Sequence, residues 1–334
     1  MIRTALLVIV MVFVSACSLV QSHKVQRESD TDQRDRGQSG AMTLDELHKE
    51  PVKFELDIPY AGTHNPRQRL DLYLPKDRRS DKIPAIVFIH GGGWQQGNKS
   101  DGPGQVVPFV RTGQYVGISI GYRLSGEATW PAQIHDCKAA IRWVRANADK
   151  YGIAPQRIGV WGRSAGGHLV LMLGVSGDVP ELEGDLGPHK GVSSKVTCVA
   201  NFFGVSEISA IIGRPSDTDR TKPDAPEAKL IGGPLRENAD KARAASPITY
   251  VTANDPPVLT VHGDEDRTVP YDQALRLDTA LRKAGVPSYL VTVKGAGHGD
   301  FGNAANDRVA AFFAKYLLGK DAEISTEAIE KPER

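Results

Sequence analysis

Residues 162–166 read Gly-Arg-Ser-Ala-Gly and place Ser164 at the centre of a Gly-x-Ser-x-Gly motif. The apolar run over residues 157–161 predicts a strand before the motif, and residues 167–173 predict a buried helix after it. A sharp turn between a strand and a helix exposes a serine hydroxyl, and glycines allow such a turn to pack closely against a sheet. The motif therefore predicts a nucleophile at Ser164.

Three other polar segments each follow a strand-like apolar run. They are His-Gly-Gly-Gly-Trp at 90–94 after residues 85–89, His-Gly-Asp-Glu-Asp at 262–266 after residues 257–261, and Gly-Ala-Gly-His-Gly at 295–299 after residues 289–293. A serine hydroxyl needs a base to take its proton, which predicts that role for His298, and the base needs an orienting carboxylate. The order of glycine loop, serine, acid and histidine is that of an α/β-hydrolase.

Strand-like and helical segments alternate after residue 80. Such alternation is typical of an α/β fold, with a mostly parallel sheet and helices on both faces. Further strands are predicted over residues 68–74 and 115–122, and helices over residues 132–150, 269–284 and 307–318.

The region from Val52 to Leu318 resembles the α/β-hydrolase esterases of the lipase and esterase group. It is most similar to bacterial esterases of the acetylxylan and feruloyl esterase type. The shared motifs are HGGGW at 90–94, GRSAGGHL at 162–169, HGDxDxxVP at 262–270 and GxGHG at 295–299. The resemblance implies a serine carboxylic ester hydrolase that forms an acyl-enzyme. Its substrates would be short-chain or carbohydrate-linked esters of the acetyl or feruloyl type.

The identity of the acid is left open by the residues alone, because Asp264, Glu265 and Asp266 stand in one loop. In the related esterases the HGxxDxxVP pattern places the acid at the fifth residue, which is Asp266 here. Asp264 directly follows a glycine and is expected to serve the turn by bonding the backbone nearby.

The resemblance also implies an oxyanion hole formed by the backbone N–H groups of Gly92, Gly93 and Ala165. Three aromatic residues near the strand ends are candidates for a substrate pocket or, equally, for the core: Trp94, Tyr122 and Trp130. Below the serine motif, Arg163 and Asp136 are expected to form an ion pair.

The N-terminus predicts export. A positive start is followed by the apolar run 5–14 and by Val-Ser-Ala-Cys at 14–17. This pattern resembles the lipobox of bacterial lipoproteins and implies a lipid on Cys17; a simple cleaved signal is the alternative. The run is short for a spanning helix, which needs about 20 residues. Ser18 favours attachment at the outer membrane, facing the periplasm, by analogy with such lipoproteins.

The predicted organisation has four parts: a lipoprotein-type signal segment at 1–17, a flexible polar tether at 18–50, an α/β-hydrolase domain at 51–319 with a lid-like insertion at 205–245, and a charged tail at 320–334. The chain has 334 residues and a net charge of +1, so no nucleic-acid partner is expected. Cys137 and Cys198 are expected to be buried free thiols, with a disulfide as the alternative. No metal and no cofactor is expected, because no Cys/His spacing is typical of a metal site.

Two other functions remain open at this point. One is an amidase or peptidase related to the prolyl peptidases, and the other is a catalytically inactive binding module on the same fold. The sequence leaves the acyl length, the alcohol and the oligomeric state undetermined.

Overall fold

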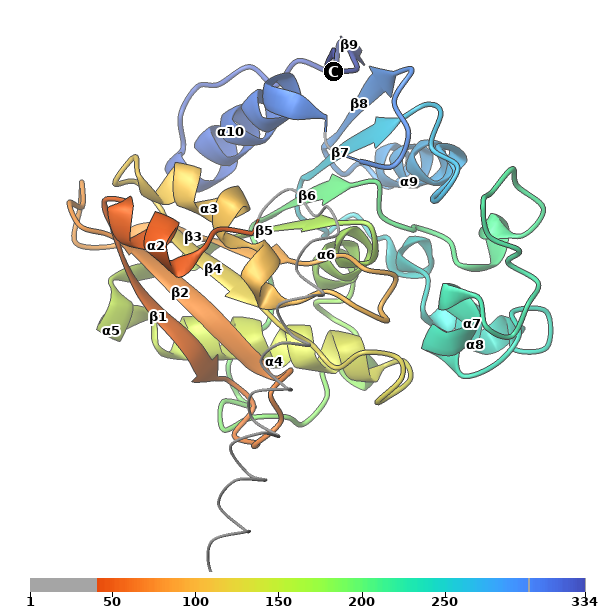
Figure 1. The fold of residues 1–334 in the computed structure, drawn as a ribbon, viewed down its shortest axis with the longest axis horizontal. Coiled ribbons are helices and arrows are strands. Elements are labelled where there is room, and N and C mark those ends of the chain that lie inside the picture. Colours follow the sequence, from red (N-terminus) through yellow and green to blue (C-terminus); the bar gives the residue numbers. More distant parts are fainter. Residues whose placement is uncertain (1–40, 300, 334) are drawn as a thin grey trace, which may run out of the picture. The chain divides into compact units, whose positions relative to one another are not determined.

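The computed structural model describes residues 41–299 and 301–333, all within a unit that spans Gly40–Arg334 (Figure 1). The predicted signal segment with Cys17 and most of the predicted tether lie outside the described residues. Within the described ranges, no helix combines the length and apolar character needed to cross a bilayer.

A nine-stranded sheet forms the centre of this unit. Its spatial order is β1 (Val52–Pro59), β2 (Arg69–Pro75), β4 (Val116–Ile120), β3 (Ile83–Ile89), β5 (Ile153–Arg163), β6 (Cys198–Phe202), β7 (Val258–Gly263), β8 (Ser288–Lys294) and β9 (Ile329–Glu330). β2 runs antiparallel to both β1 and β4, and all other neighbours are parallel. The mostly parallel α/β-hydrolase sheet predicted from the sequence is confirmed.

The central strands are apolar on both faces because helices cover both faces. β3 is buried along its whole length. Its side chains alternate between two core clusters, with Ala85, Val87 and Ile89 in one and Ile86 and Phe88 in the other. Strands of this kind read as continuous apolar runs, which is why the sequence predicts them well.

Helices pack on each side of the sheet (Figure 1). The first cluster includes residues of α4 (Ala132–Ala146), α6 (Ala165–Val175) and α9 (Asp272–Lys283). The second includes residues of α2 (Leu44–Lys49), α3 (Pro103–Val110) and α10 (Gly302–Leu318). Shorter helices are α5 (Ala148–Tyr151), α7 (Pro226–Ile231) and α8 (Ala239–Ala244).

Both predicted flanking boundaries need correction. Helix α2 lies within the predicted tether; a capping box between Thr43 and Glu46 starts it, and Leu47 is buried. The predicted charged tail at 320–334 is part of the fold, because β9 pairs in parallel with β8 and Ile324 and Ile329 lie in the core. Burial of these two isoleucines helps to hold the segment on the sheet.

Candidate active site

The four predicted segments meet at one edge of the sheet. They follow β3, β5, β7 and β8, which belong to one parallel array, so their carboxyl ends share an edge (Figure 1). Ligands of open parallel sheets bind at this edge.

Ser164 occupies a strained turn between β5 and α6, with φ 55° and ψ −121°. A Cβ atom at Gly162 would lie 2.3 Å from the Gly166 carbonyl oxygen, and one at Gly166 would lie 2.1 Å from that of Ile89. Only glycine fits at these two positions, because backbone atoms cannot move aside. The glycines of the motif therefore allow the turn that presents Ser164.

Ser164, His298 and Asp266 form a continuous chain of hydrogen bonds. The distance from His298 Nε2 to Ser164 Oγ is 3.0 Å, and the distance from His298 Nδ1 to Asp266 Oδ2 is 2.7 Å. A carboxylate only accepts, so Nδ1 carries the proton of the neutral ring and Nε2 is free to accept the serine proton. The structure thus brings together the three residues predicted for catalysis.

Asp266 is buried and accepts three hydrogen bonds. Oδ1 accepts from the N–H groups of Thr268 and Val269, each at 2.8 Å, while Oδ2 lies 2.7 Å from His298 Nδ1. His262 Nε2 lies 3.3 Å from Oδ2 and donates to the Val269 carbonyl oxygen at 2.8 Å. Burial acts to raise the pKa of Asp266, but the His262 and His298 rings beside the carboxylate outweigh it and hold the pKa well below its usual range.

The neighbouring carboxylates have other environments. Asp264 is exposed and accepts a hydrogen bond from the N–H of Gly295 at 2.7 Å, at the start of the histidine loop. Glu265 is also exposed. Asp266 is the carboxylate in this loop whose oxygen contacts His298, as the family pattern implied.

The predicted oxyanion loop lies directly against the serine turn. A Cβ atom at Gly91 would lie 2.9 Å from the Arg163 carbonyl oxygen and 3.3 Å from Ser164 Cβ. Gly92 and Gly93 have φ values of 104° and 59°, which favour glycine. Among the described residues, the N–H groups of Gly92, Gly93 and Ala165 donate to no acceptor. That of Ala165 is free because it opens a helix.

His90 and Tyr122 brace this loop from below. Their rings stack with centroids 4.3 Å apart, and the Tyr122 hydroxyl donates to the His90 carbonyl oxygen at 3.1 Å. Burial lowers the pKa of His90 to about 4, so the ring is neutral. Tyr122 has no exposed surface, so it presents no surface to a substrate in this structure.

Trp94 is also buried, and it joins the oxyanion loop to α6. Its Nε1 donates to His168 Nδ1 at 3.2 Å, and His168 Nε2 donates in turn to the Ala245 carbonyl oxygen at 2.7 Å. Burial lowers the pKa of His168 to about 4. Of the three aromatic candidates for a substrate pocket, Trp130 retains exposed surface; its ring packs against His168 at 5.5 Å.

Phe203 contacts the candidate base and is not predicted from the sequence. It follows β6 with a φ of 42°, and its ring centroid lies 4.4 Å from that of His298. A positive φ at a bulky residue is uncommon and is maintained by the surrounding packing. Its position directly after the strand β6 is the available signal, because the four predicted site segments also directly follow strands.

The insertion at 205–245 contacts both sides of the site through α7. Pro226 packs beside Gly93, whose added Cβ would lie 3.5 Å from it. Arg220 forms a buried ion pair with Glu227 at 2.6 Å and donates to the carbonyl oxygen of Thr268, in the acid loop. The segment therefore joins the oxyanion loop to the acid loop.

The predicted ion pair between Arg163 and Asp136 is wrong. Asp136 pairs with Arg123 at 2.8 Å, and the guanidinium of Arg163 lies over the Trp161 and Phe202 rings. The thiols of Cys137 and Cys198 are free and buried, as expected. No metal-binding group of His, Cys, Asp and Glu side chains occurs among residues 41–299 and 301–333.

Comparisons with known proteins agree with this geometry. The sequence matches the family described as BD-FAE over residues 70–281. Esterase LipC of Mycobacterium tuberculosis is 32% identical over 242 residues, which cover 70% of this chain and 57% of LipC. A truncated carbohydrate esterase from gut microbiota has a TM-score of 0.76 and 33% identity, over 84% of this chain and 100% of that one.

A bifunctional GH43-CE protein of Bacteroides eggerthii has a TM-score of 0.73 and 34% identity, over 79% of this chain and 35% of that one. The chain spans 51–63% of the length of the three mycobacterial esterases and ester hydrolases LipC, LipQ and LipM.

Proposed function

Because the chain belongs to the BD-FAE family and is an α/β-hydrolase esterase, we propose that it cleaves short-chain or carbohydrate-linked esters through an acyl-serine intermediate. The observation that carries this proposal is the hydrogen-bond chain from Ser164 through His298 to Asp266. Acetyl and feruloyl groups are the proposed acyl groups. The carbohydrate esterases among the similar structures support a sugar as the alcohol.

In the proposed mechanism, His298 Nε2 takes the hydroxyl proton of Ser164 while Oγ attacks the ester carbonyl carbon. The resulting oxyanion receives hydrogen bonds from the free N–H groups of Gly92, Gly93 and Ala165. One such donor contributes about 3 kcal/mol to the transition state.

The tetrahedral intermediate then breaks down by loss of the alcohol, because the proton on His298 is available to the leaving oxygen. The imidazolium of His298 gives its proton to the leaving alkoxide, and the C–O bond of the ester breaks to leave an acyl-serine. Water repeats the sequence: His298 takes its proton, the hydroxide adds to the acyl carbon, and Ser164 leaves with the proton returned. The buried carboxylate of Asp266 stabilises the imidazolium in both halves.

Three measurements test the proposal. A fluorophosphonate probe should label the wild-type protein and not Ser164→Ala. The wild type should hydrolyse p-nitrophenyl acetate, acetylated xylan or methyl ferulate faster than a p-nitroanilide peptide. Absence of labelling and of ester hydrolysis would favour an inactive binding module, while faster cleavage of the anilide would favour a prolyl-peptidase-like amidase.

A further inference from the structure

A second concave site lies beside the loop that follows β4, outside the Ser164, His298 and Asp266 chain. This cavity is a depression open to solvent, with a volume of about 650 Å³, and it is lined by Arg123, Ser125, Glu127, Thr129, Trp130 and His135, among others. We propose that this cavity binds a neutral sugar unit of the substrate, next to the unit whose ester is cleaved. The proposal rests on the esterase function given above and specifies the alcohol side of that substrate.

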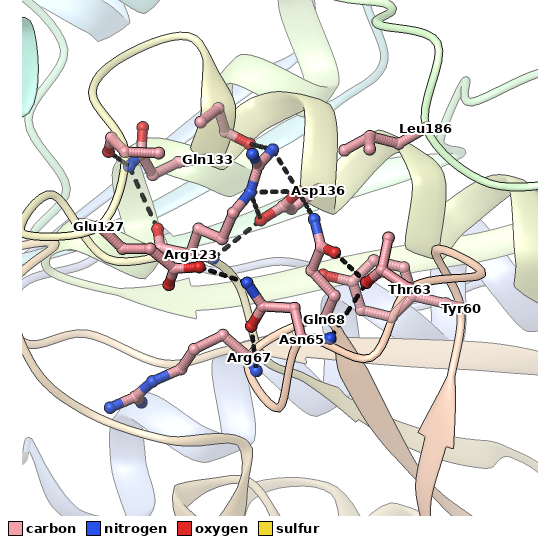
Figure 2. A network of polar contacts seen from close by, with 12 residues as sticks. Tyr60, Thr63, Asn65, Arg67, Gln68, Arg123, Glu127, Gln133, Asp136 and Leu186 are labelled. Carbon is pink, nitrogen blue, oxygen red and sulfur yellow. Dashed lines mark hydrogen bonds and ion pairs between the residues drawn. The ribbon is translucent and has the colours of Figure 1, made fainter.

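The cavity is built on a fixed polar framework (Figure 2). The Asp136 side chain is fully buried and accepts from the Arg123 backbone N–H at 2.8 Å, from the Arg123 guanidinium at 2.8 Å and 2.9 Å, and from Gln68 Nε2 at 2.7 Å. Gln133 Nε2 donates to the carbonyl oxygens of Arg123 and Ala128 at 3.1 and 2.6 Å. These hydrogen bonds hold the loop in one conformation, which reduces the entropy lost on binding.

Several polar groups of the cavity have unused hydrogen-bonding capacity. Within the described part of the chain, Arg123 Nη1 and the Thr129 hydroxyl form no hydrogen bond. Glu127 Oε1 accepts from Asn65, while Oε2 has no partner among the same residues (Figure 2). Ser125 is 8% exposed, and its hydroxyl lacks a partner as well. These groups include donors, an acceptor and hydroxyls that do both.

That mixture indicates the chemistry of the ligand. An anion would use only donors and a cation only acceptors, whereas sugar hydroxyls donate and accept at once. The half-buried Trp130 adds an aromatic surface, on which the apolar C–H face of a sugar ring can pack.

The charges in the cavity favour a neutral ligand. The positive charge of Arg123 is compensated by the buried Asp136 carboxylate at 2.8 Å. Burial lowers the pKa of His135, which favours its neutral form. Glu127 is then the charge left without an ion-pair partner among the described residues, and it would repel an anion such as a uronate.

Two hydrogen bonds place the cavity next to the catalytic elements. The N–H of Ser125 donates to the carbonyl oxygen of Trp94 at 2.7 Å. Trp94 directly follows Gly93, one of the proposed oxyanion donors. The N–H of Trp130 donates to the carbonyl oxygen of Leu230 in α7 at 2.7 Å. A sugar held here would therefore be anchored to the same loop that stabilises the oxyanion.

The test compares two substrates, acetylated xylotriose and p-nitrophenyl acetate, which lacks the sugar. The quantity measured is the kcat/KM for acetylated xylotriose divided by the kcat/KM for p-nitrophenyl acetate. Glu127→Gln and Ser125→Ala should each lower this ratio. The decrease should be about tenfold for Glu127→Gln, because a hydrogen bond to a charged group is lost. Asp149→Asn is the matched control, since its side chain is 87% exposed in α5, before β5. The control should change neither rate.

Binding gives a second, independent measurement. The full-length Ser164→Ala protein should bind unmodified xylotriose by calorimetry, and Glu127→Gln in the same background should weaken that binding about tenfold. Unchanged ratios in both variants, or tighter binding of glucuronate than of xylotriose, would overturn the sugar site. Absence of p-nitrophenyl acetate hydrolysis by the wild type would instead overturn the esterase function itself.

Discussion

Replacing Asp266 by asparagine tests the hydrogen-bond pattern around the candidate acid. Both carboxylate oxygens accept: Oδ1 from the N–H groups of Thr268 and Val269, and Oδ2 from the His298 ring. An amide accepts on one side only, so at least one present donor must face its NH₂ group in either orientation. A backbone N–H group can only donate, whereas an imidazole nitrogen can change from donor to acceptor when the ring changes its tautomer.

We therefore expect the amide oxygen to remain with the backbone and its NH₂ to face His298. The ring would then carry its proton on Nε2 and could no longer accept the proton of Ser164. A comparable replacement in a Ser-His-Asp protease lowers kcat by about 10⁴, which corresponds to a barrier increase of about 5 kcal/mol.

The assay is steady-state hydrolysis of p-nitrophenyl acetate by variants whose melting temperatures are measured alongside. Asp264→Asn is the matched control, because it is exposed and its single acceptor role toward Gly295 is one that an amide oxygen can keep. A kcat for Asp266→Asn above about 1% of wild type would refute the tautomer argument. A larger loss in Asp264→Asn would assign the acid to that residue.

Three other outcomes are expected. Ser164→Ala should remove hydrolysis while leaving the melting temperature nearly unchanged; turnover above about 1% in a preparation free of wild-type enzyme would contradict its role. Burial lowers the pKa of His90 and His168 to about 4, so the unfolded chain binds protons first as the pH falls from about 6.5. The free energy of unfolding in urea should thus drop by about 2 kcal/mol per histidine between pH 7 and pH 5, and a constant value would contradict the neutral, buried state. If Cys17 carries a lipid, as we propose, the Cys17→Ser protein should be lost from the membrane fraction or keep its signal segment. A wild-type protein that is soluble and whose mature N-terminus is not residue 17 would exclude a lipid anchor.

The sequence predicts those parts of the site that depend on local pattern. Ser164 and His298 lie in short glycine motifs after buried strands, and the apolar runs that form β3 and β5 are continuous because both faces are covered. Among the three carboxylates of the acid loop, the resemblance to related esterases indicates Asp266. In the structure, it is the one with an oxygen toward His298.

Features that depend on contacts between distant segments could not be predicted in the same way. The pairing of β9 with β8 joins residues 36 apart, such as Lys294 and Glu330. In the charged segment that carries β9, the large apolar residues are two isoleucines, Ile324 and Ile329, which is too few for a strand pattern. Asp136 pairs with Arg123, which lies on the other side of a loop. The spacing of apolar residues in the sequence does not indicate which arginine pairs with Asp136. The contact between the Phe203 and His298 rings likewise joins two segments that are far apart in the sequence.

The contact between the buried Arg220 and the acid loop has a consequence for substrates that do not dissolve in water. Swinging the insertion away from the acid loop would keep the ion pair with Glu227, because both residues lie in the insertion. It would break the hydrogen bond from the Arg220 guanidinium to the Thr268 carbonyl oxygen, which costs about 1.5–3 kcal/mol for a charged donor. An open form would then account for less than about 10% of the molecules. We therefore expect no interfacial activation: the rate with tributyrin should rise smoothly through its solubility limit, and an abrupt increase there would mean that a lipid surface releases the segment.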